Sequence, residues 1–112
     1  MNFHDKVYEL VACFKQTQDY KEYIKLKEQI KEDDKTFKMV KDFKDKQREH
    51  QVKYINGEKL TEEENANMQN LYSIVIQNDK ARSLLECEMK LDVLLADMQK
   101  IVAEGIKDVI EF

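Results

Sequence analysis

Residues 80–110, KARSLLECEMKLDVLLADMQKIVAEGIKDVI, decide the fold of this chain. Apolar residues recur along this stretch at spacings of three and four, the period of an α-helix. They are Leu84, Leu91, Leu94, Leu95, Met98, Ile101, Val102, Ile106 and Val109. A second stripe, formed by Leu85, Met89 and Val93, lies to one side of the first. A surface helix normally shows one stripe roughly 100° wide, so two stripes predict one long helix from Lys80 to Ile110 that contacts other helices on two sides.

The composition favours a single, mostly helical domain over residues 1–112. Charged residues make up 38% of the chain and hydrophobic residues 42%, with no proline and two glycines. The apolar residues lie in periodic blocks, which argues against disorder, and no segment alternates as a strand does. The formal net charge of −4 argues against a general nucleic-acid binder, whose domain is normally basic.

The first residues and the cysteines indicate a cellular location. The opening MNFHDKVYEL contains Asp5 and Glu9 and no continuous apolar segment, so we expect no signal peptide. No apolar run approaches the ~18 residues of a membrane span, and we expect no membrane contact. Cys13 and Cys87 are far apart in the sequence. These features predict a cytoplasmic protein with free thiols.

Two helices are expected before residue 32. The first has one apolar face, made of Phe3, Val7, Leu10, Val11 and Phe14. After a break at residues 17–19, Asp19 with Glu22 three residues later predicts a capping box for the second helix. We expect the apolar face of the second helix to follow Tyr20, Tyr23, Ile24 and Ile30, with Leu26 off that face.

The third helix is expected from about Lys35 to Ile55, after an acidic run that offers caps. Its apolar stripe begins at Phe37, Val40 and Phe43, is replaced by Lys44, Gln47 and Gln51, and returns at Tyr54 and Ile55. This interruption predicts that the helix leaves the core halfway along.

A fourth helix should return beside the third. Asn56-Gly57 is a strong stop signal, because glycine accepts the left-handed geometry of a helix C-cap, and Thr61 with Glu64 predicts a capping box. The fourth helix is polar at first and apolar later (Met68, Leu71, Tyr72, Val75). We therefore expect an antiparallel hairpin with a packed base and a projecting tip. The predicted fold is all-α, with about five helices in an elongated antiparallel bundle around the long C-terminal spine helix.

No catalytic or metal-binding motif is found in the sequence. His4 and His50 have no ligand-type spacing and are expected to be solvated. Cys13 and Cys87 form neither a Cys-x-x-Cys pair nor a Cys/His cluster. We expect no enzymatic activity and no cofactor, and we consider a redox or metal sensor acting through Cys87 the least favoured function.

A basic run on the third helix offers a charged surface. Residues 35–53 contain seven basic and three acidic residues, a local charge of +4. The candidates for a docking surface, for an acidic partner or an RNA backbone, are Lys38, Lys41, Lys44, Lys46 and Arg48. The alternative, which we favour, is a solvated face paired with acidic neighbours such as residues 62–64 across the hairpin.

Several segments resemble the YlbF/YmcA family of small bacterial proteins, YheA-like relatives included. They are the motif GEKLTEEE at residues 57–64, LLECEMKL at 84–91 and LLADMQKI at 94–101, within a five-helix arrangement. The resemblance implies a non-enzymatic cytoplasmic regulator of competence, sporulation or biofilm formation. It also implies protein partners, family paralogues among them, in a complex that adjusts RNA processing by a membrane-bound ribonuclease. That complex is linked to iron–sulfur clusters. Because residues 103–112 contain no cysteine here, we do not expect this chain alone to hold a cluster.

Two interaction surfaces are predicted. Tyr54, Ile55 and Leu60 at the hairpin tip are candidates for partner docking, since aromatic anchors ringed by polar groups are typical of binding hot spots. The alternative is that they staple the two helix ends together. For a two-fold homodimer, the candidate interface residues are Leu85, Met89, Val93, Ile106, Val109 and Ile110. If the first helix covers the second stripe, the protein is instead a monomer.

Overall fold

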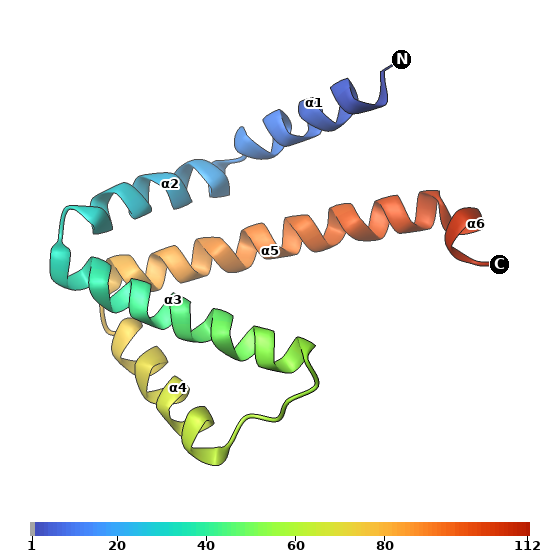
Figure 1. The fold of residues 1–112 in the computed structure, drawn as a ribbon. Coiled ribbons are helices and arrows are strands. Elements are labelled where there is room, and N and C mark those ends of the chain that lie inside the picture. The colour runs from blue at the N-terminus through green and yellow to red at the C-terminus, as the bar shows by residue number, and fades with distance from the viewer. Residues whose placement is uncertain (1) are drawn as a thin grey trace. The chain divides into compact units, whose positions relative to one another are not determined.

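The computed structural model describes residues 2–112, and all regular secondary structure among these residues is helical. The helices are α1 (Phe3–Lys15), α2 (Gln18–Lys31), α3 (Asp34–Ile55), α4 (Glu62–Val75), α5 (Asp79–Gly105) and α6 (Lys107–Ile110) (Figure 1). The all-α prediction is confirmed, with six helices in place of about five. None of the described helices is long and apolar enough to cross a membrane.

The chain divides into two compact units. The hairpin unit is Lys25–Leu84, and the terminal unit is made of Met1–Ile24 and Leu85–Phe112. The division falls within α2 and within α5, so part of each of these helices belongs to each unit. The prediction of a single domain over residues 1–112 stays a prediction.

The hairpin unit holds most of the buried side chains. Its buried apolar residues are Leu26, Ile30, Val40, Phe43, Val75, Ala81 and Leu84. Val75 and Ala81 are completely buried where α4 gives way to α5. The Asn78 side chain joins this turn to α3, because its Nδ2 donates to the Thr36 hydroxyl at 3.4 Å. This contact closes the base of the unit.

Local capping chemistry begins and ends the helices. The Asp33 carboxylate accepts from the Thr36 hydroxyl at 2.7 Å and from the Thr36 N–H, and these two bonds, the hydroxyl first, lower the pKa of Asp33. Gly57 closes α3 with a φ of 78°, the left-handed conformation that glycine adopts without strain. At α4, both bonds of the Thr61–Glu64 capping box form, at 3.0 and 3.3 Å. These predicted boundaries are confirmed to within one residue.

The predicted cap at Asp19 is wrong. Helix α2 begins one residue earlier, at Gln18, so Asp19 already lies in its first turn. The capping group is the Thr17 hydroxyl, which accepts from the Tyr20 N–H at 3.3 Å. The same hydroxyl donates to the Phe14 carbonyl at 2.7 Å and so joins the end of α1 to α2.

The predicted continuous helix from Lys80 to Ile110 is also interrupted. Helix α5 starts at Asp79, with the Ala81 N–H donating to the Asn78 side chain, and ends at Gly105. Ile106 leaves the helical conformation (φ −122°, ψ 25°) before the short α6. Glycine is the poorest helix former after proline, which explains a break at this point.

The buried faces of α2 and α3 differ from the apolar faces predicted for these helices. Leu26, expected off the apolar face of α2, is buried, whereas Ile24 is exposed. Leu26 and Ile30 are four residues apart and so share one face of the helix. On α3 the buried stripe is Thr36, Val40, Phe43 and His50, so the helix stays packed beyond its middle. His50, expected to be solvated, is a buried residue.

Candidate functional site

Helices α3 and α4 form the predicted antiparallel hairpin (Figure 1). Near the base, the rings of Phe43 and Tyr72 lie 6.0 Å apart. Near the tip, the Lys53 ammonium pairs with the Glu64 carboxylate. The pairing of residue 43 with 72 and of 53 with 64 shows that the chain directions are opposed. The hairpin therefore presents residues from the end of α3 and the start of α4 side by side.

The tip exposes two large apolar side chains in succession. Tyr54 is 82% exposed and Ile55 79% exposed, while Leu60 is half-buried. Tyr54 and Ile55 line a surface groove of about 550 Å³ with Gln47, His50, Gln51 and Met68. Leu60 does not line this groove, so the structure brings together two of the three predicted tip residues.

His50 also lines this groove. The sequence analysis did not predict a role for it there. Its side chain is buried, and its Nε2 atom has no hydrogen-bond partner within the described chain. An unsatisfied buried polar atom is costly. The available signal was its spacing: His50 lies seven residues after Phe43, two helical turns along the same face.

The predicted basic residues lie mostly in ion pairs within α3. Asp45 accepts from Lys41 at 2.9 Å and lies 3.8 Å from the Arg48 guanidinium, and the Lys41 hydrogen bond is the main cause of the lowered pKa of Asp45. Lys44 donates to Gln47 at 3.3 Å, and Lys38 is exposed. Pairs of this exposed kind contribute little to stability. The ion pairs of Lys41 and Arg48 with Asp45 are therefore weak constraints on these side chains.

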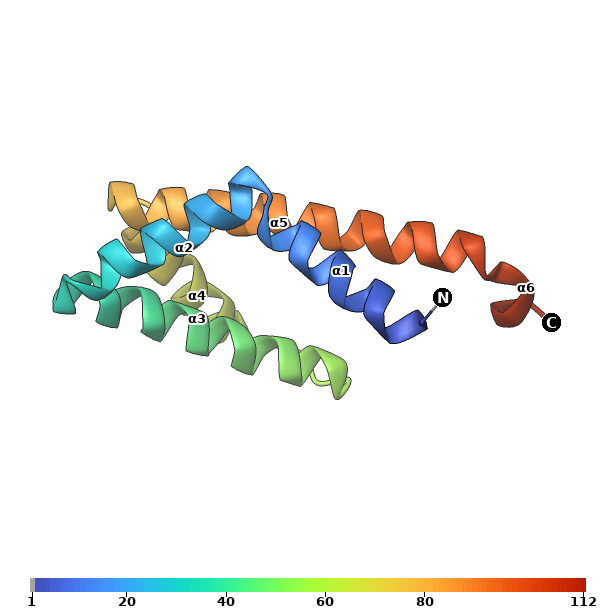
Figure 2. The same ribbon diagram turned by 90° about the horizontal axis from the view of Figure 1, so that it is seen from above.

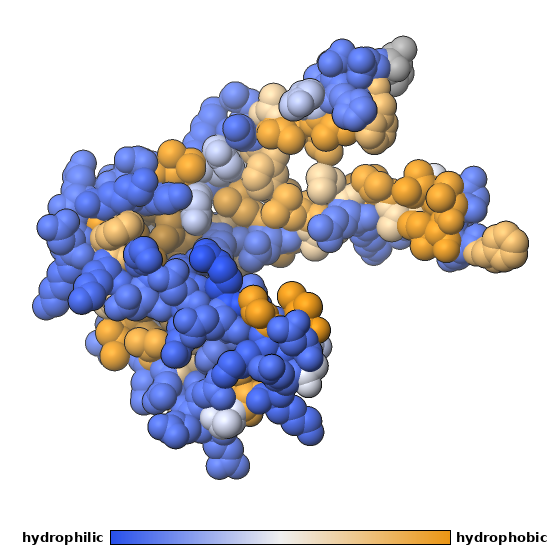
Figure 3. Space-filling view, in the orientation of Figure 1, coloured by the Kyte–Doolittle hydropathy of each residue, from blue (hydrophilic) through white to orange (hydrophobic). Residues whose placement is uncertain are grey.

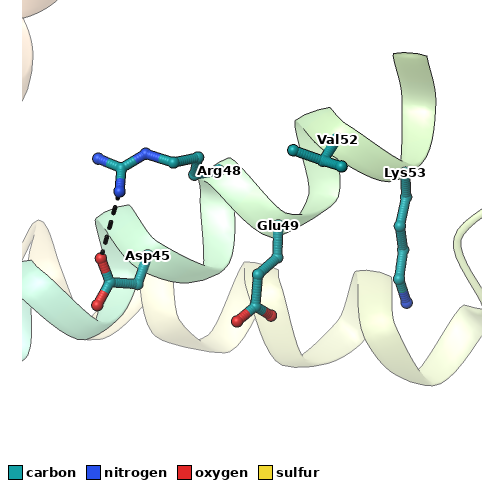
Figure 4. Close-up of a pocket in the computed structure, with 5 residues that line it drawn as sticks. All are labelled: Asp45, Arg48, Glu49, Val52 and Lys53. Carbon is teal, nitrogen blue, oxygen red and sulfur yellow. Dashed lines mark ion pairs between the residues drawn. The ribbon is translucent and has the colours of Figure 1, made fainter. Parts of the chain in front are cut away.

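A second groove of about 600 Å³ runs along α3 itself (Figure 4). Asp45, Arg48, Glu49, Val52 and Lys53 line it. Figure 4 shows the Arg48 side chain turned to Asp45, and Glu49 and Lys53 extending toward the facing helix. Charged groups of both signs thus surround the exposed Val52. Such a lining suits contact with a protein surface that carries both charges.

The ion pair across the hairpin is the strongest electrostatic feature of the site. The Lys53 side chain donates to Glu64, and this bond is the largest cause of a fall in the pKa of Glu64 from its usual 4.5 to about 2. The same bond raises the pKa of Lys53. Glu64 also accepts from the Thr61 N–H, so one carboxylate caps α4 and ties it to α3.

Nothing in the described residues is arranged for metal binding. They contain no group of three or more His, Cys, Asp or Glu side chains placed to hold an ion. Cys13 is exposed and Cys87 is buried, and burial raises the pKa of the Cys87 thiol, which disfavours the thiolate that binds metals or reacts. These thiols do not fit an iron–sulfur cluster held by one chain.

The predicted dimer residues lie in the terminal unit. Met89, Val93, Ile106, Val109 and Ile110 are exposed, and Leu85 is half-buried. Met89 and Val93 line a shallow groove with Glu86 and Lys90. Their role in a homodimer stays a prediction.

Comparison with known proteins identifies relatives along nearly the whole chain. Residues 3–107 match the family described as "Control of competence regulator ComK, YlbF/YmcA". A UPF0342 protein of Caldicellulosiruptor bescii is 36% identical over 106 residues, covering 95% of this chain and 89% of the relative. A UPF0342 protein of Bacillus licheniformis is 32% identical over 108 residues, with 96% and 92% covered.

A solved structure has the same fold. It is a protein of unknown function (DUF964) from Bacillus stearothermophilus, with a TM-score of 0.80 over 96% of this chain and 95% of that one. Its sequence identity is 18%, so the likeness concerns the fold alone.

Proposed function

The chain belongs to the YlbF/YmcA family, and from that premise we propose that it is a non-catalytic regulator that acts by binding other proteins. The family description points to control of competence. By resemblance, the regulated processes include sporulation, biofilm formation and RNA processing, in the cytoplasm. The partners would be family paralogues or members of an RNA-processing complex.

The exposed tip of the hairpin is the observation that carries this proposal. Tyr54 and Ile55 stand in solvent beside the half-buried Met68, above a histidine whose Nε2 is unsatisfied. Side chains so exposed contribute little to holding α3 and α4 together, which weighs against the staple interpretation. An aromatic anchor, a neighbouring aliphatic group and a polar rim match the composition of protein–protein hot spots.

A double substitution, Tyr54→Ser with Ile55→Ser, tests the tip. The full-length protein would be captured from the native host after cross-linking, and bound proteins identified by mass spectrometry. We expect the double variant to lose the partner that the unmodified protein retains, with little change in melting temperature. Tyr8→Ser, an exposed tyrosine on α1, is the matched control and should retain the partner. Equal capture by the double variant would contradict the proposal.

RNA binding through α3 is the alternative function. A row of cations comprising Lys38, Lys41, Lys44 and Arg48 supports it, whereas the pairing of Lys41 and Arg48 with Asp45 weighs against it. Binding of a labelled RNA would be titrated with salt, because phosphate contacts weaken steeply as ionic strength rises. Loss of such binding in Lys38→Ala with Arg48→Ala would favour RNA. Absence of RNA binding at low salt would remove this alternative.

A further inference from the structure

The groove at the hairpin tip continues toward the base of the hairpin. Gln47 and Met68 line the tip groove, and the same two residues line a neighbouring groove of about 460 Å³. The other residues that line the neighbouring groove are Phe43, Gln69, Tyr72 and Ser73. Figures 1 and 2 both show α3 and α4 side by side along this part of the chain. The two grooves therefore form one continuous depression between α3 and α4, which we call the hairpin groove.

The hairpin groove is long enough to hold a helix. Its lining on α3 extends from Phe43 to Ile55. At ~1.5 Å per residue this length is about 18 Å, or roughly three helical turns. A groove between packed helices commonly binds an amphipathic helix of another protein, whose apolar residues recur at spacings of three and four.

The lining of the hairpin groove is uncharged. Among the residues that the structure describes, its lining contains no Asp, Glu, Lys or Arg, although 38% of the chain is charged. On α4 this lining belongs to a longer uncharged run, NANMQNLYSIVIQN at residues 65–78. The core of a protein–protein interface is similarly poor in charge and rich in aromatic residues and Met. A nucleic-acid backbone requires cations, so this lining favours a protein as the occupant.

His50 is the buried polar residue of this lining. It is 9% exposed, and its Nε2 atom has no hydrogen-bond partner within residues 2–112. Buried polar groups nearly always have a partner. A bound molecule that places a polar side chain beside this nitrogen would supply the missing hydrogen bond. The unpaired histidine is therefore a second, independent indication that the groove is occupied when the protein acts.

The edge of the groove on α3 carries positive charge. Four residues follow one another along one line of the helix, at spacings of four, three and four: Lys44, Arg48, Gln51 and Ile55. The last two line the groove, and the Lys44 ammonium donates to Gln47 of the same lining at 3.3 Å. Arg48 lies between them, and its exposed ion pair within α3 is of a weak kind. The opposite edge belongs to the uncharged part of α4.

We propose that the hairpin groove binds an amphipathic helix of a partner protein, with an uncharged, mainly apolar face and acidic residues along one flank. The uncharged face lies between α3 and α4. The acidic flank meets Lys44 and Arg48, because complementary charges at the edge of an interface fix orientation and partner choice.

The tip anchors one end of the bound helix. Figure 3 shows apolar side chains gathered at the end of α3, on a hairpin whose visible face is otherwise mostly hydrophilic. Tyr54 and Ile55 are the last residues of this helix, and both are largely exposed. The inference rests on the proposed function, since these two residues belong to both sites, and it adds the chemistry of the partner.

Peptide selection against the full-length protein tests the groove. The probe is a displayed library of peptides of about 16 residues, varied at every position, whose helical length of about 24 Å covers the groove. We expect the selected sequences to carry apolar residues at helical spacing and an excess of Asp and Glu on one flank. The Kd of a selected peptide is then measured by fluorescence anisotropy against variants of the protein.

Two neighbouring residues of α4 provide matched variants. Tyr72 lines the groove and is 47% exposed, whereas Ile74 does not line it and is 53% exposed. Tyr72→Asp should raise the Kd at least about tenfold, because the bound helix then buries an unpaired charge. Ile74→Asp should change the Kd less than about threefold. If circular dichroism shows that Tyr72→Asp loses helical content, Gln69→Asp, at an exposed position of the same lining, is used in its place.

The charge of the flank is tested at Arg48. Arg48→Glu should raise the Kd about tenfold, because it reverses the charge that meets the acidic flank. Arg48→Lys keeps the charge and should leave the Kd nearly unchanged. An unchanged Kd for Arg48→Glu overturns the proposal.

The remaining outcomes decide between occupants. Peptides with the expected pattern that bind more weakly to both Tyr72→Asp and Arg48→Glu support the proposal. Selection of no peptide, selection of peptides flanked by Lys and Arg, or equal binding by the two α4 variants overturns it. A peptide that dissociates a dimer in sedimentation equilibrium would assign the groove to a second copy of the chain. A labelled RNA that displaces the peptide and no longer binds to Tyr72→Asp would assign it to nucleic acid.

Failure of this inference is distinguishable from failure of the proposed function. Capture of a host partner that depends on Tyr54 and Ile55, together with selection of no peptide, overturns the bound helix alone. A selected helix that binds the groove, together with host capture unaffected by Tyr54→Ser with Ile55→Ser, overturns the docking role of the tip alone.

Discussion

The hairpin unit and the terminal unit are both built from amphipathic helices, but they bury very different numbers of apolar side chains. In the hairpin unit, seven apolar side chains are buried around capped helix ends. In the terminal unit, only Cys87 and Leu91 are buried among the described residues. Yet the terminal unit contains the longest apolar stripes in the chain. Amphipathic periodicity thus predicts that a face will be covered, but not which chain covers it.

This difference predicts where mutations destabilise the protein. A core that one chain completes should respond to substitutions at any concentration. Substitutions on a face that another molecule covers should change stability only at concentrations where the complex forms, because binding stabilises the folded state by mass action. The following predictions compare the two units, from the largest effect to the smallest.

The largest contrast is between two phenylalanines. Phe43 in the hairpin unit is 3% exposed and Phe3 in the terminal unit 74% exposed. Phe43→Ala should lower the free energy of unfolding by about 3–5 kcal/mol through the cavity it leaves. Phe3→Ala should change it by less than about 0.5 kcal/mol in dilute solution. Urea denaturation measures both, and equal losses would contradict the contrast.

The capping box gives the next effect. Thr61→Ala removes the hydroxyl that accepts from the Glu64 N–H at 3.0 Å and should cost about 1 kcal/mol of unfolding free energy. Thr61→Ser keeps the hydroxyl and is the control. Because this box belongs to the hairpin unit, the loss should not depend on protein concentration. A loss that appears only in concentrated solution would place α4 in an interface.

The two glycines should respond with opposite signs. Gly57 has a φ of 78°, and open space surrounds the position of an added Cβ at both glycines. Gly57→Ala should destabilise by about 1 kcal/mol through backbone strain alone. Gly105→Ala should stabilise by about 0.5–1 kcal/mol and add helical signal where α5 now ends. Thermal unfolding followed by circular dichroism checks both signs, and destabilisation by Gly105→Ala would show that the break is required.

The smallest effect concerns pH. The pKa of Glu64 is lowered to about 2 in the folded protein by its bond to Lys53, so the ionised form is favoured on folding. The stabilisation is complete above the usual value of 4.5 and is lost as pH falls from there toward 2. Glu64→Gln should be less stable at neutral pH, and the difference should vanish in acid. Glu63→Gln is the neighbouring control. A pH-independent difference would contradict the pairing.

Sequence reasoning succeeded where one or two neighbouring residues decide the structure. The cap at Thr61 and the stop at Gly57 depend on local chemistry and were predicted. The predicted cap at Asp19 was wrong because Thr17, two residues earlier, caps the helix instead. The prediction that His50 is solvated was wrong because the buried stripe of α3 lies to one side of the predicted one. The predicted stripe was interrupted by the polar residues Lys44, Gln47 and Gln51.

The site was only partly predictable for the same reason. Tyr54 and Ile55 were named from their apolar character within a polar segment. Their groove needs Met68 from α4 and the buried His50, which depend on how two helices pack. The sequence predicted an apolar face on α1 but not that none of its residues is buried, because periodicity does not show what covers a face.

Hydrogen exchange at several protein concentrations most directly tests the claim that the hairpin unit is complete in one chain and the terminal unit is not. Exchange protection reports local opening free energy. Over the range in which the predicted homodimer dissociates, amides of α1 and of the later half of α5 should lose protection on dilution. Amides of α3 and α4 should keep theirs. Unchanged protection of α1 at every concentration, or loss of protection in α3 and α4 together with α1, would contradict the claim.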